Sequence, residues 1–358
     1  MPGWGSMGDL APSGSVGVMK VLLTGGSGFI GHHVVDHLLA ETDWEIVVLD
    51  SLSYAGDISK VVELSRFDPQ RVRVLWHDLR APIPPATAGR IGAVDAMFNL
   101  ASASHVPHSI DDPVPFVQNN VNVALHMLEF ARQHRPALFV QFSTDEVFGP
   151  APQGTEFREW DVHVPSNPYA ASKSAQEQLA TSYWRTYGLP VVITNTMNVY
   201  GERQHPEKFI PICVRQLRAG KPVPVHGERT ADGWKAGSRY WLYAGDVASA
   251  LVFIAERSSP ARYPDVDRPD RWNLVGREEL TNLEVAEHVA ATMGVPLEVE
   301  WVDFHRSRPG HDRRYALDGS KLAAAGWRAG TPFPEGIRRV VEWLRTTDRR
   351  TGSSATRP

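Results

Sequence analysis

The chain has 358 residues, of which 42% are hydrophobic and 22% charged, and these values are typical of a globular protein with one large core. The formal net charge of -4 provides no basic field, so we expect small-molecule partners and no nucleic acid. Cys213 is the only cysteine, which excludes an internal disulfide bond and suits a cytoplasmic location. Apolar runs are too short to cross a bilayer, so no membrane association is expected.

Short, β-rich apolar runs alternate with longer amphipathic stretches in the first part of the chain. This alternation predicts an α/β fold with a doubly wound parallel sheet between two helical layers. After Tyr200 the chain becomes rich in proline and glycine, which indicates a smaller, loop-rich second lobe. The expected strands are residues 21–23, 46–49, 72–75, 96–100, 138–142 and 191–194.

The sequence predicts that the chain has four parts. We expect a disordered leader at residues 1–18 and a flexible tail at residues 346–358, because both are rich in small polar residues, glycine and proline. Between them we expect a cofactor-binding domain at 19–198 plus 240–262, and a substrate lobe mainly at 199–239 plus 263–345.

The first expected strand runs into the sequence Thr24-Gly-Gly-Ser-Gly-Phe-Ile-Gly31, which opens a helix. Its glycines permit a tight turn and a close approach to a pyrophosphate, which the N–H groups of the helix start can bind. Asp50 ends the next strand, where a carboxylate accepts hydrogen bonds from ribose hydroxyls and repels a 2′-phosphate. NAD is therefore predicted rather than NADP, bound by Gly25, Gly28, Phe29, Ile30, Gly31 and Asp50.

Two further segments follow strands at the same edge of the sheet. Asp78 and Leu79 follow the third strand, and Leu100, Ala101 and Ala103 follow the fourth. We expect them beside the adenine and the nicotinamide ribose. Capping of a helix by Asp78 is the alternative interpretation.

Tyr169 and Lys173 lie four residues apart in an expected helix, so their side chains share one face. An ammonium near a phenol favours the phenolate and lowers the tyrosine pKa. The pair predicts a base that takes a hydroxyl proton while hydrogen leaves carbon for the cofactor. Both residues are therefore expected at the nicotinamide as well as at the substrate.

A pair of carboxyl groups follows the fifth expected strand, in the sequence Phe142-Ser-Thr-Asp-Glu-Val-Phe-Gly149. With Tyr169 and Lys173, this segment resembles the dTDP-glucose 4,6-dehydratases, whose pattern is S-T-D-E-V-Y-G; related epimerases and decarboxylases usually lack the Asp-Glu pair. The resemblance covers the chain from Met19 to about Trp343. It implies the Rossmann fold of an extended short-chain dehydrogenase/reductase, and a homodimer packed through two long helices.

The resemblance also implies the roles of these residues in dehydrating the hexose of a nucleoside diphosphate sugar. Tyr169 would deprotonate the C4 hydroxyl, with Thr144 hydrogen-bonded near the C4 oxygen, while NAD accepts the C4 hydride. Glu146 would remove the C5 proton and protonated Asp145 would assist loss of the C6 hydroxyl. Return of the hydride to C6 leaves a 4-keto-6-deoxy sugar. The alternative is that Asp145 and Glu146 only cap the next helix.

Further segments resemble the family's nucleotide-sugar site. The guanidinium groups of Arg239 and Arg308 suit a diphosphate, and the amides of Asn198 and Asn273 can donate hydrogen bonds. His311 has no second histidine or cysteine at ligand spacing, so no metal is expected. The implied substrate-binding residues are Ser104, Thr144, Asn198, Lys208, Phe209, Ile210, Arg239, Asn273, Arg308, His311 and Tyr315.

Several positions depart from the family pattern. Ala103 stands where the family often has Glu, Pro107 where it has Asp, and Val199 replaces the second Asn of S-N-N. His226 replaces a Tyr, and the loop at 227–238 is longer than the family's turn. Because these positions border the base and sugar pockets, the reaction is better specified than the nucleotide and hexose.

Three alternatives therefore stay open. A UDP-sugar 4-epimerase, or a dehydratase with altered regiochemistry such as 5,6-elimination, would share Tyr169, Lys173 and NAD. A catalytically silent nucleotide-binding protein is the alternative from another class.

Overall fold

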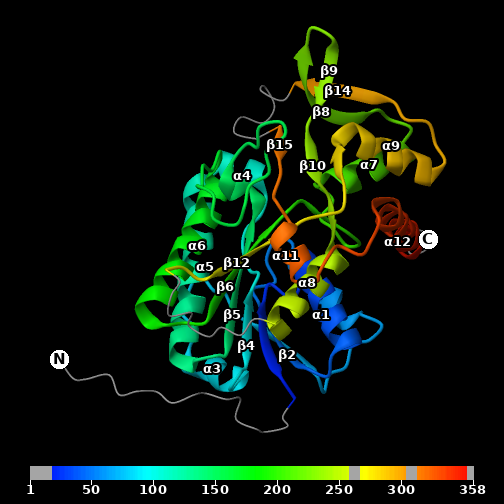
Figure 1. Cartoon of the computed structure of the whole chain (residues 1–358). Coiled ribbons are helices and arrows are strands. Elements are labelled where there is room, and N and C mark those ends of the chain that lie inside the picture. Colours follow the sequence, from blue (N-terminus) through cyan, green and yellow to red (C-terminus); the bar gives the residue numbers. More distant parts are fainter. Residues whose placement is uncertain (1–17, 258–266, 304–312, 353–358) are drawn as a thin grey trace, which may run out of the picture.

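The computed structural model describes residues 18–257, 267–303 and 313–352. Its centre is a seven-stranded parallel sheet with the strand order β12-β6-β5-β4-β1-β2-β3 (Figure 1). The order reverses between β1 and β4, and in such sheets ligands bind where the strands around this point end. The strands are β1 (Lys20–Thr24), β2 (Glu45–Asp50), β3 (Val72–Trp76), β4 (Ala96–Asn99), β5 (Leu138–Thr144), β6 (Val191–Thr196) and β12 (Asp270–Leu274).

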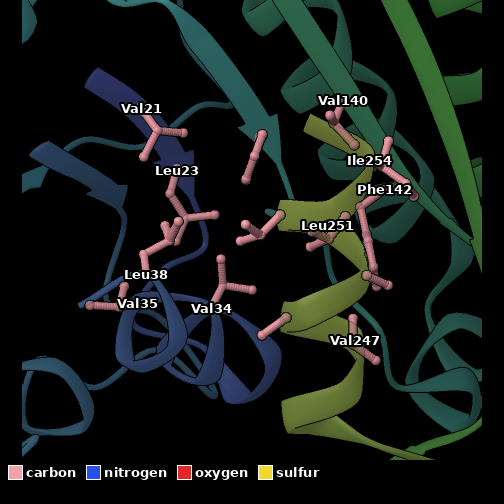
Figure 2. Close-up of a cluster of buried hydrophobic side chains, with 14 of the residues drawn as sticks. Val21, Leu23, Val34, Val35, Leu38, Val140, Phe142, Val247, Leu251 and Ile254 are labelled. Carbon is pink, nitrogen blue, oxygen red and sulfur yellow. The ribbon is translucent and has the colours of Figure 1, made fainter. Parts of the chain in front are cut away.

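Helices cover both faces of this sheet. On one face α5 (Pro113–His134) packs against α6 (Pro168–Tyr187), and on the other α1 (Phe29–Glu41) packs against α8 (Ala244–Arg257) (Figure 1). Figure 2 shows the apolar side chains of α1 and α8 meeting those of the sheet: Val34, Val35, Leu38, Val247, Leu251 and Ile254 against Val21, Leu23, Val140 and Phe142. Shorter elements connect these layers: α2 (Ser59–Val62), α3 (Pro85–Ile91), α4 (Val106–Asp111) and the 3-10 helix η1 (Asp145–Phe148).

A second lobe lies beyond the carboxyl ends of the strands and has a core of its own (Figure 1). It contains two small sheets with the orders β14-β8-β9 and β13-β10-β15. Their strands are β8 (Val223–Thr230), β9 (Gly233–Ala236), β10 (Ser238–Tyr240), β13 (Glu279–Thr281), β14 (Val299–Asp303) and β15 (Arg314–Tyr315). The strand pair β7 (Val199–Tyr200) and β11 (Leu242–Tyr243) and the helices α7 (Phe209–Arg218), α9 (Asn282–Met293), α11 (Ser320–Ala324) and α12 (Phe333–Gly352) complete the described chain.

The doubly wound sheet and its six expected strands are confirmed, since they correspond to β1 to β6. Three details differ from the sequence analysis. β12 belongs to the central sheet although it falls in a segment expected mainly in the substrate lobe. Residues expected as a long loop at 227–238 contain the antiparallel pairing of β8 with β9. α12 continues to Gly352, beyond the expected start of the tail.

No helix within the described ranges is both long enough and apolar enough to cross a bilayer.

Candidate active site

The glycine loop joins β1 to α1 beside the point where the strand order reverses. Gly25 has a φ of 71°, in the left-handed region, and a Cβ there would lie 3.0 Å from the backbone of Ala101. A Cβ at Gly31 would lie 2.1 Å from the carbonyl oxygen of Gly25. No side chain caps the start of α1, so N–H groups of its first turn, at Phe29 and Ile30, can bind an anion. The loop fits the pyrophosphate of a dinucleotide.

Asp50 ends β2 and is buried against this loop. Its Oδ2 accepts a hydrogen bond from the N–H of Ser27, and its Oδ1 one from the N–H of Leu52, both at 2.9 Å. Gly28 closes the turn by donating its N–H to the carbonyl oxygen of Gly25 at 3.0 Å. Burial raises the pKa of Asp50, and the two N–H donors oppose this. The carboxylate therefore holds the loop in place, and its other lone pairs can accept ribose hydroxyls.

The segment after β3 forms a local turn. The carboxylate of Asp78 accepts hydrogen bonds from the backbone N–H of Arg80 at 2.9 Å and from its guanidinium, but it caps no helix, because the next helix, α3, begins only at Pro85. Leu79 is buried in the core, and its carbonyl oxygen lies 2.8 Å from Nδ1 of His126. Asp78 is not among the residues that line the pocket described below. Its predicted contact with adenine stays a prediction.

The segment after β4 is held against the glycine loop. The N–H of Ala101 donates to Oγ1 of Thr24 at 3.1 Å, and Leu100 packs against the core. The side-chain amide of Asn120, on α5, pairs with both backbone groups of Ala103, at 2.8 and 3.0 Å. Asn120 was not among the predicted residues, because its position in an amphipathic helix gives no sign of a distant backbone partner.

A pocket with a volume of about 230 Å³ lies at the carboxyl ends of β5 and β6. Thr144, Asp145, Glu146 and Tyr169 all line it. Thr144 ends β5, and η1 carries the two carboxyl groups directly after it. The Thr144 hydroxyl donates to Oδ1 of Asp145 at 2.9 Å and accepts the N–H of Glu146 at 3.3 Å. The proposed proton-transfer groups therefore face one cavity.

The two carboxyl groups have different surroundings. Asp145 is buried, and burial together with the neighbouring Glu146 raises its pKa to about 7. Glu146 accepts hydrogen bonds from the amide of Asn167 at 3.1 Å and the hydroxyl of Tyr315 at 3.4 Å. Such a difference suits one group to act as an acid and the other as a base.

Asn167 links this site to the start of α6. Its Oδ1 accepts the N–H of Ala170 at 2.9 Å and so caps the helix, and Pro168 occupies the first turn. Its Nδ2 donates to Glu146. One side chain therefore fixes the start of the helix that carries Tyr169 relative to the carboxylate.

Lys173 does not line the pocket but lies buried beside it. Its Nζ donates to the carbonyl oxygen of Phe142 and to Oε1 of Gln176, both at 2.7 Å. Burial lowers the pKa of Lys173 to about 7, although the negative charge of the nearby Glu177 acts in the opposite direction. Burial and the adjacent Glu146 raise the pKa of Tyr169. Lys173 is not among the groups that shift the pKa of Tyr169 in the structure, so the expected lowering of that pKa by Lys173 is not seen.

Besides Thr144, five expected substrate residues line the same pocket. Lys208 donates from Nζ to the carbonyl oxygen of Ser104 at 3.2 Å, and Arg239 stacks on the ring of Tyr315 at 4.9 Å. Tyr315 itself is buried behind them, where it reaches Glu146. The five are Ser104, Asn198, Lys208, Phe209 and Arg239.

The remaining substrate residues have other positions. Asn273 is fully buried in β12, outside the pocket lining, and its Nδ2 donates to the carbonyl oxygens of Phe157 and Asp318 at 3.0 and 3.1 Å. Its amide joins two backbone segments, and the role of Asn273 as a substrate ligand stays a prediction. Ile210 is buried in the core of the second lobe. Arg308 and His311 lie outside the described residues.

Comparison with known proteins gives a match to the model of the NAD dependent epimerase/dehydratase family over residues 21–266. The chain belongs to this family. It is 36% identical over 340 residues to a probable dTDP-glucose 4,6-dehydratase of Sinorhizobium fredii, covering 91% of this chain and 92% of that protein. It is 35% identical to dTDP-glucose 4,6-dehydratase 1 of Escherichia coli K12, with the same coverage.

Solved structures of epimerase/dehydratase family members are similar over nearly the whole chain. DesIV, a dTDP-glucose 4,6-dehydratase from Streptomyces venezuelae with NAD bound, has a TM-score of 0.81 and 34% identity, covering 93% of this chain and 98% of that one. A UDP-glucose 4-epimerase from Thermus thermophilus, also with NAD, has a TM-score of 0.80 and 32% identity, covering 91% and 99%. The predictions of the fold, the family and NAD as the cofactor are confirmed.

In this epimerase/dehydratase site, several pocket residues were absent from the predicted site residues. His105 and Glu207 directly adjoin the predicted Ser104 and Lys208, so the same sequence segments point to them. Other pocket residues come from the second lobe or from strand ends, among them Thr196, Gln204, His226, Trp241 and Asn282. His226 is marked in the sequence by its departure from the family pattern, whereas Thr196, Gln204 and Asn282 have neighbours in space that are distant in sequence, and no local pattern marks them.

Proposed function

We propose that this chain is an NAD-dependent dehydratase that converts dTDP-glucose, or a closely related nucleoside diphosphate hexose, to the 4-keto-6-deoxy sugar. The observation that carries the proposal is the adjacent pair Asp145 and Glu146 in one pocket with Tyr169. Two relatives that each align with 91% of this chain are named as dTDP-glucose 4,6-dehydratases, one of them as a probable one. Bound NAD supplies the two-electron chemistry, in which it accepts hydrogen and its electron pair from C4 and returns them to C6.

The side chains of the pocket divide the proton transfers. Tyr169 takes the proton of the C4 hydroxyl, and Thr144, beside it, binds the C4 oxygen as a ketone forms. The ketone acidifies the C5 proton, which the Glu146 carboxylate removes. Asp145, with its pKa of about 7, retains a proton near neutral pH and passes it to the departing C6 hydroxyl. Water is lost, and Glu146 then returns its proton to C5 as C6 receives the hydride. A proton transfer from Tyr169 by way of solvent restores Asp145.

Tyr169 needs positive charge to ionise, because its own surroundings raise its pKa. We propose that the oxidised nicotinamide ring supplies this charge, while the Lys173 ammonium, tied to Phe142 and Gln176, holds the helix against β5. Lys173 would then act mainly by positioning α6 and by orienting the nicotinamide ribose.

The cations of the pocket suit the diphosphate of the substrate. Arg239 presents a planar guanidinium and Lys208 an ammonium to the same cavity. Asn198 adds an amide donor. We propose that these three bind the pyrophosphate and sugar, and that Arg308 and His311 contribute from the segment beyond the described residues.

Product analysis with dTDP-glucose tests the proposal directly. A mass loss of one water together with a 6-methyl proton signal is the expected result. Unchanged mass with an inverted C4 centre would instead indicate a 4-epimerase, like the UDP-glucose 4-epimerase of Thermus thermophilus. A vinylic signal would indicate 5,6-elimination, and absence of turnover with dTDP-, UDP-, GDP- and CDP-hexoses would indicate a silent binding protein.

Three further expectations stand as proposals. We propose a homodimer packed through α5 and α6, which light scattering of the purified protein tests.

The division between a cofactor domain and a substrate lobe predicts that NAD protects mainly the former from proteolysis. A cytoplasmic location follows from the single cysteine and can be tested by fractionation of the source cells.

A further inference from the structure

Two histidines and a glutamate meet at the rim of the pocket, although they come from distant segments. His105 directly precedes α4, His108 lies one turn further along it, and Glu207 lies just before α7. One ligand atom from each of the three lies within 4.8 Å of the others. Nε2 of His105 is 3.4 Å from Oε2 of Glu207, and the two imidazole rings are 4.2 Å apart between centroids. A tetrahedral zinc ion places its ligand atoms about 3.3 Å apart, so small side-chain rotations would suffice.

Neighbouring side chains orient the carboxylate of this cluster. The hydroxyl of Tyr54 donates to Oε2 of Glu207 at 2.7 Å, and Nδ1 of His205 lies 3.4 Å from the same oxygen. Tyr54 also stacks on His205, with centroids 4.7 Å apart. Hydrogen bonds from an outer shell to a ligand carboxylate are a regular feature of metal sites. They lower the pKa of Glu207 and keep it charged.

The cluster is open to solvent on one side and to the pocket on the other. His108 and Glu207 are exposed, which gives an ion a route of entry, and His105 and Glu207 line the pocket. Three protein ligands leave a fourth tetrahedral position free for water or for an oxygen of a bound molecule. Two imidazoles and one carboxylate favour zinc and its neighbours over magnesium, which prefers oxygen ligands.

We propose that His105, His108 and Glu207 form a binding site for a divalent ion of the zinc class at the mouth of the pocket. The ion joins the start of α4 to the turn before α7 and so links the cofactor domain to the second lobe. The site is separate from the proton-transfer residues. Its existence does not depend on the proposed dehydration, because binding is measured on the protein without substrate.

Calorimetric titration of the full chain with zinc chloride tests the site, after chelator treatment and with no polyhistidine tag. We expect saturable binding of one ion per chain, a rise in Tm with zinc, and no competition by a large excess of magnesium. Cobalt gives a second readout, because a tetrahedral site with nitrogen ligands produces visible absorption bands.

His108→Phe is the informative variant, since it removes ligand nitrogens, keeps a ring against Tyr54 and lies outside the pocket lining. We expect zinc affinity to fall at least about tenfold and the cobalt bands to disappear. His134→Phe, at the far end of α5, is the matched control and should bind zinc as the unaltered protein does. No saturable binding to the unaltered protein, or equal binding by His108→Phe, would overturn the proposal.

Discussion

Glu177 of α6 and Arg271 of β12 form an ion pair of 2.6 Å, with side chains that are 0% and 1% exposed. The other oxygen of Glu177 accepts hydrogen bonds from Ser143, at the end of β5, and from Asn195 at 2.8 Å. Arg271 also stacks on Trp160, 4.0 Å from the ring centroid. This buried network ties the helix of Tyr169 to the strand that precedes the carboxyl groups proposed to act in proton transfer.

Glu177→Gln should therefore destabilise the protein strongly, because it leaves the buried Arg271 guanidinium without the carboxylate that pairs with it. We expect a loss of about 3–5 kcal/mol in the free energy of unfolding, measured by urea denaturation. Adding Arg271→Met to Glu177→Gln should restore part of the loss, since it removes the unpaired charge. A single variant as stable as the unaltered protein would contradict a structural role for the pair.

Tyr169→Phe and Glu146→Gln should stop the reaction at different points. With Tyr169→Phe no group takes the C4 hydroxyl proton, so we expect no absorbance of reduced nicotinamide when enzyme and dTDP-glucose are mixed in stopped flow. With Glu146→Gln the C4 oxidation proceeds but C5 keeps its proton, so that absorbance should rise and persist. Each variant should lower kcat about 10²–10⁴-fold. Unchanged turnover in either one would remove the residue from its proposed role.

The raised pKa of Asp145 predicts a pH dependence of both activity and stability. Asp145 loses the proton it donates as pH rises through about 7, so kcat should fall above that pH. The folded protein also holds this proton between the ordinary value of 3.8 and about 7, where the unfolded chain releases it. This group therefore lowers stability as pH rises across that window.

Asp145→Asn separates the pH-dependent effect of Asp145 on stability from that of Lys173, whose pKa is also about 7. The amide oxygen can still accept from Thr144 but carries no proton to donate. We expect the variant to be about 1–3 kcal/mol more stable than the unaltered protein at pH 8, with little difference at pH 4, and to lose activity. If the variant and the unaltered protein were equally stable at pH 8 as well as at pH 4, Asp145 would have an ordinary pKa in the folded protein.

Gly31→Ala tests the packing of the cofactor loop. Its Cβ would lie 2.1 Å from the Gly25 carbonyl oxygen, so α1 must move away from the loop and NAD binding should be lost. Gly89→Ala in α3 is the matched control, because no atom lies within 4 Å of its Cβ, and it should leave binding unchanged and stabilise the helix by up to about 1 kcal/mol. Isothermal titration with NAD gives both results. Normal NAD binding by Gly31→Ala would mean that the glycine loop can change its conformation to accommodate the added Cβ and still bind the cofactor.

Local patterns were sufficient to predict the central part of this molecule. The glycine loop, the carboxyl pair and the spacing of Tyr169 and Lys173 each occupy a few consecutive residues, and burial between helical layers produces the apolar runs of the strands. The partners of Lys173 could not be predicted in this way, because its bond to the Phe142 carbonyl depends on how α6 packs against β5. The hydrogen bonds of Asn273 could not be predicted for a similar reason, since its partners are backbone groups far away in sequence.

β12 pairs with β6 at the edge of the central sheet, although the chain passes through much of the second lobe between the two strands. During translation the sheet must therefore wait for residue 274 before its last strand is in place. A fragment cut after β6 would expose that strand's hydrogen-bonding groups to other chains and invite aggregation. The cofactor-binding part of this protein is thus no self-contained module that could be excised at this point of the chain.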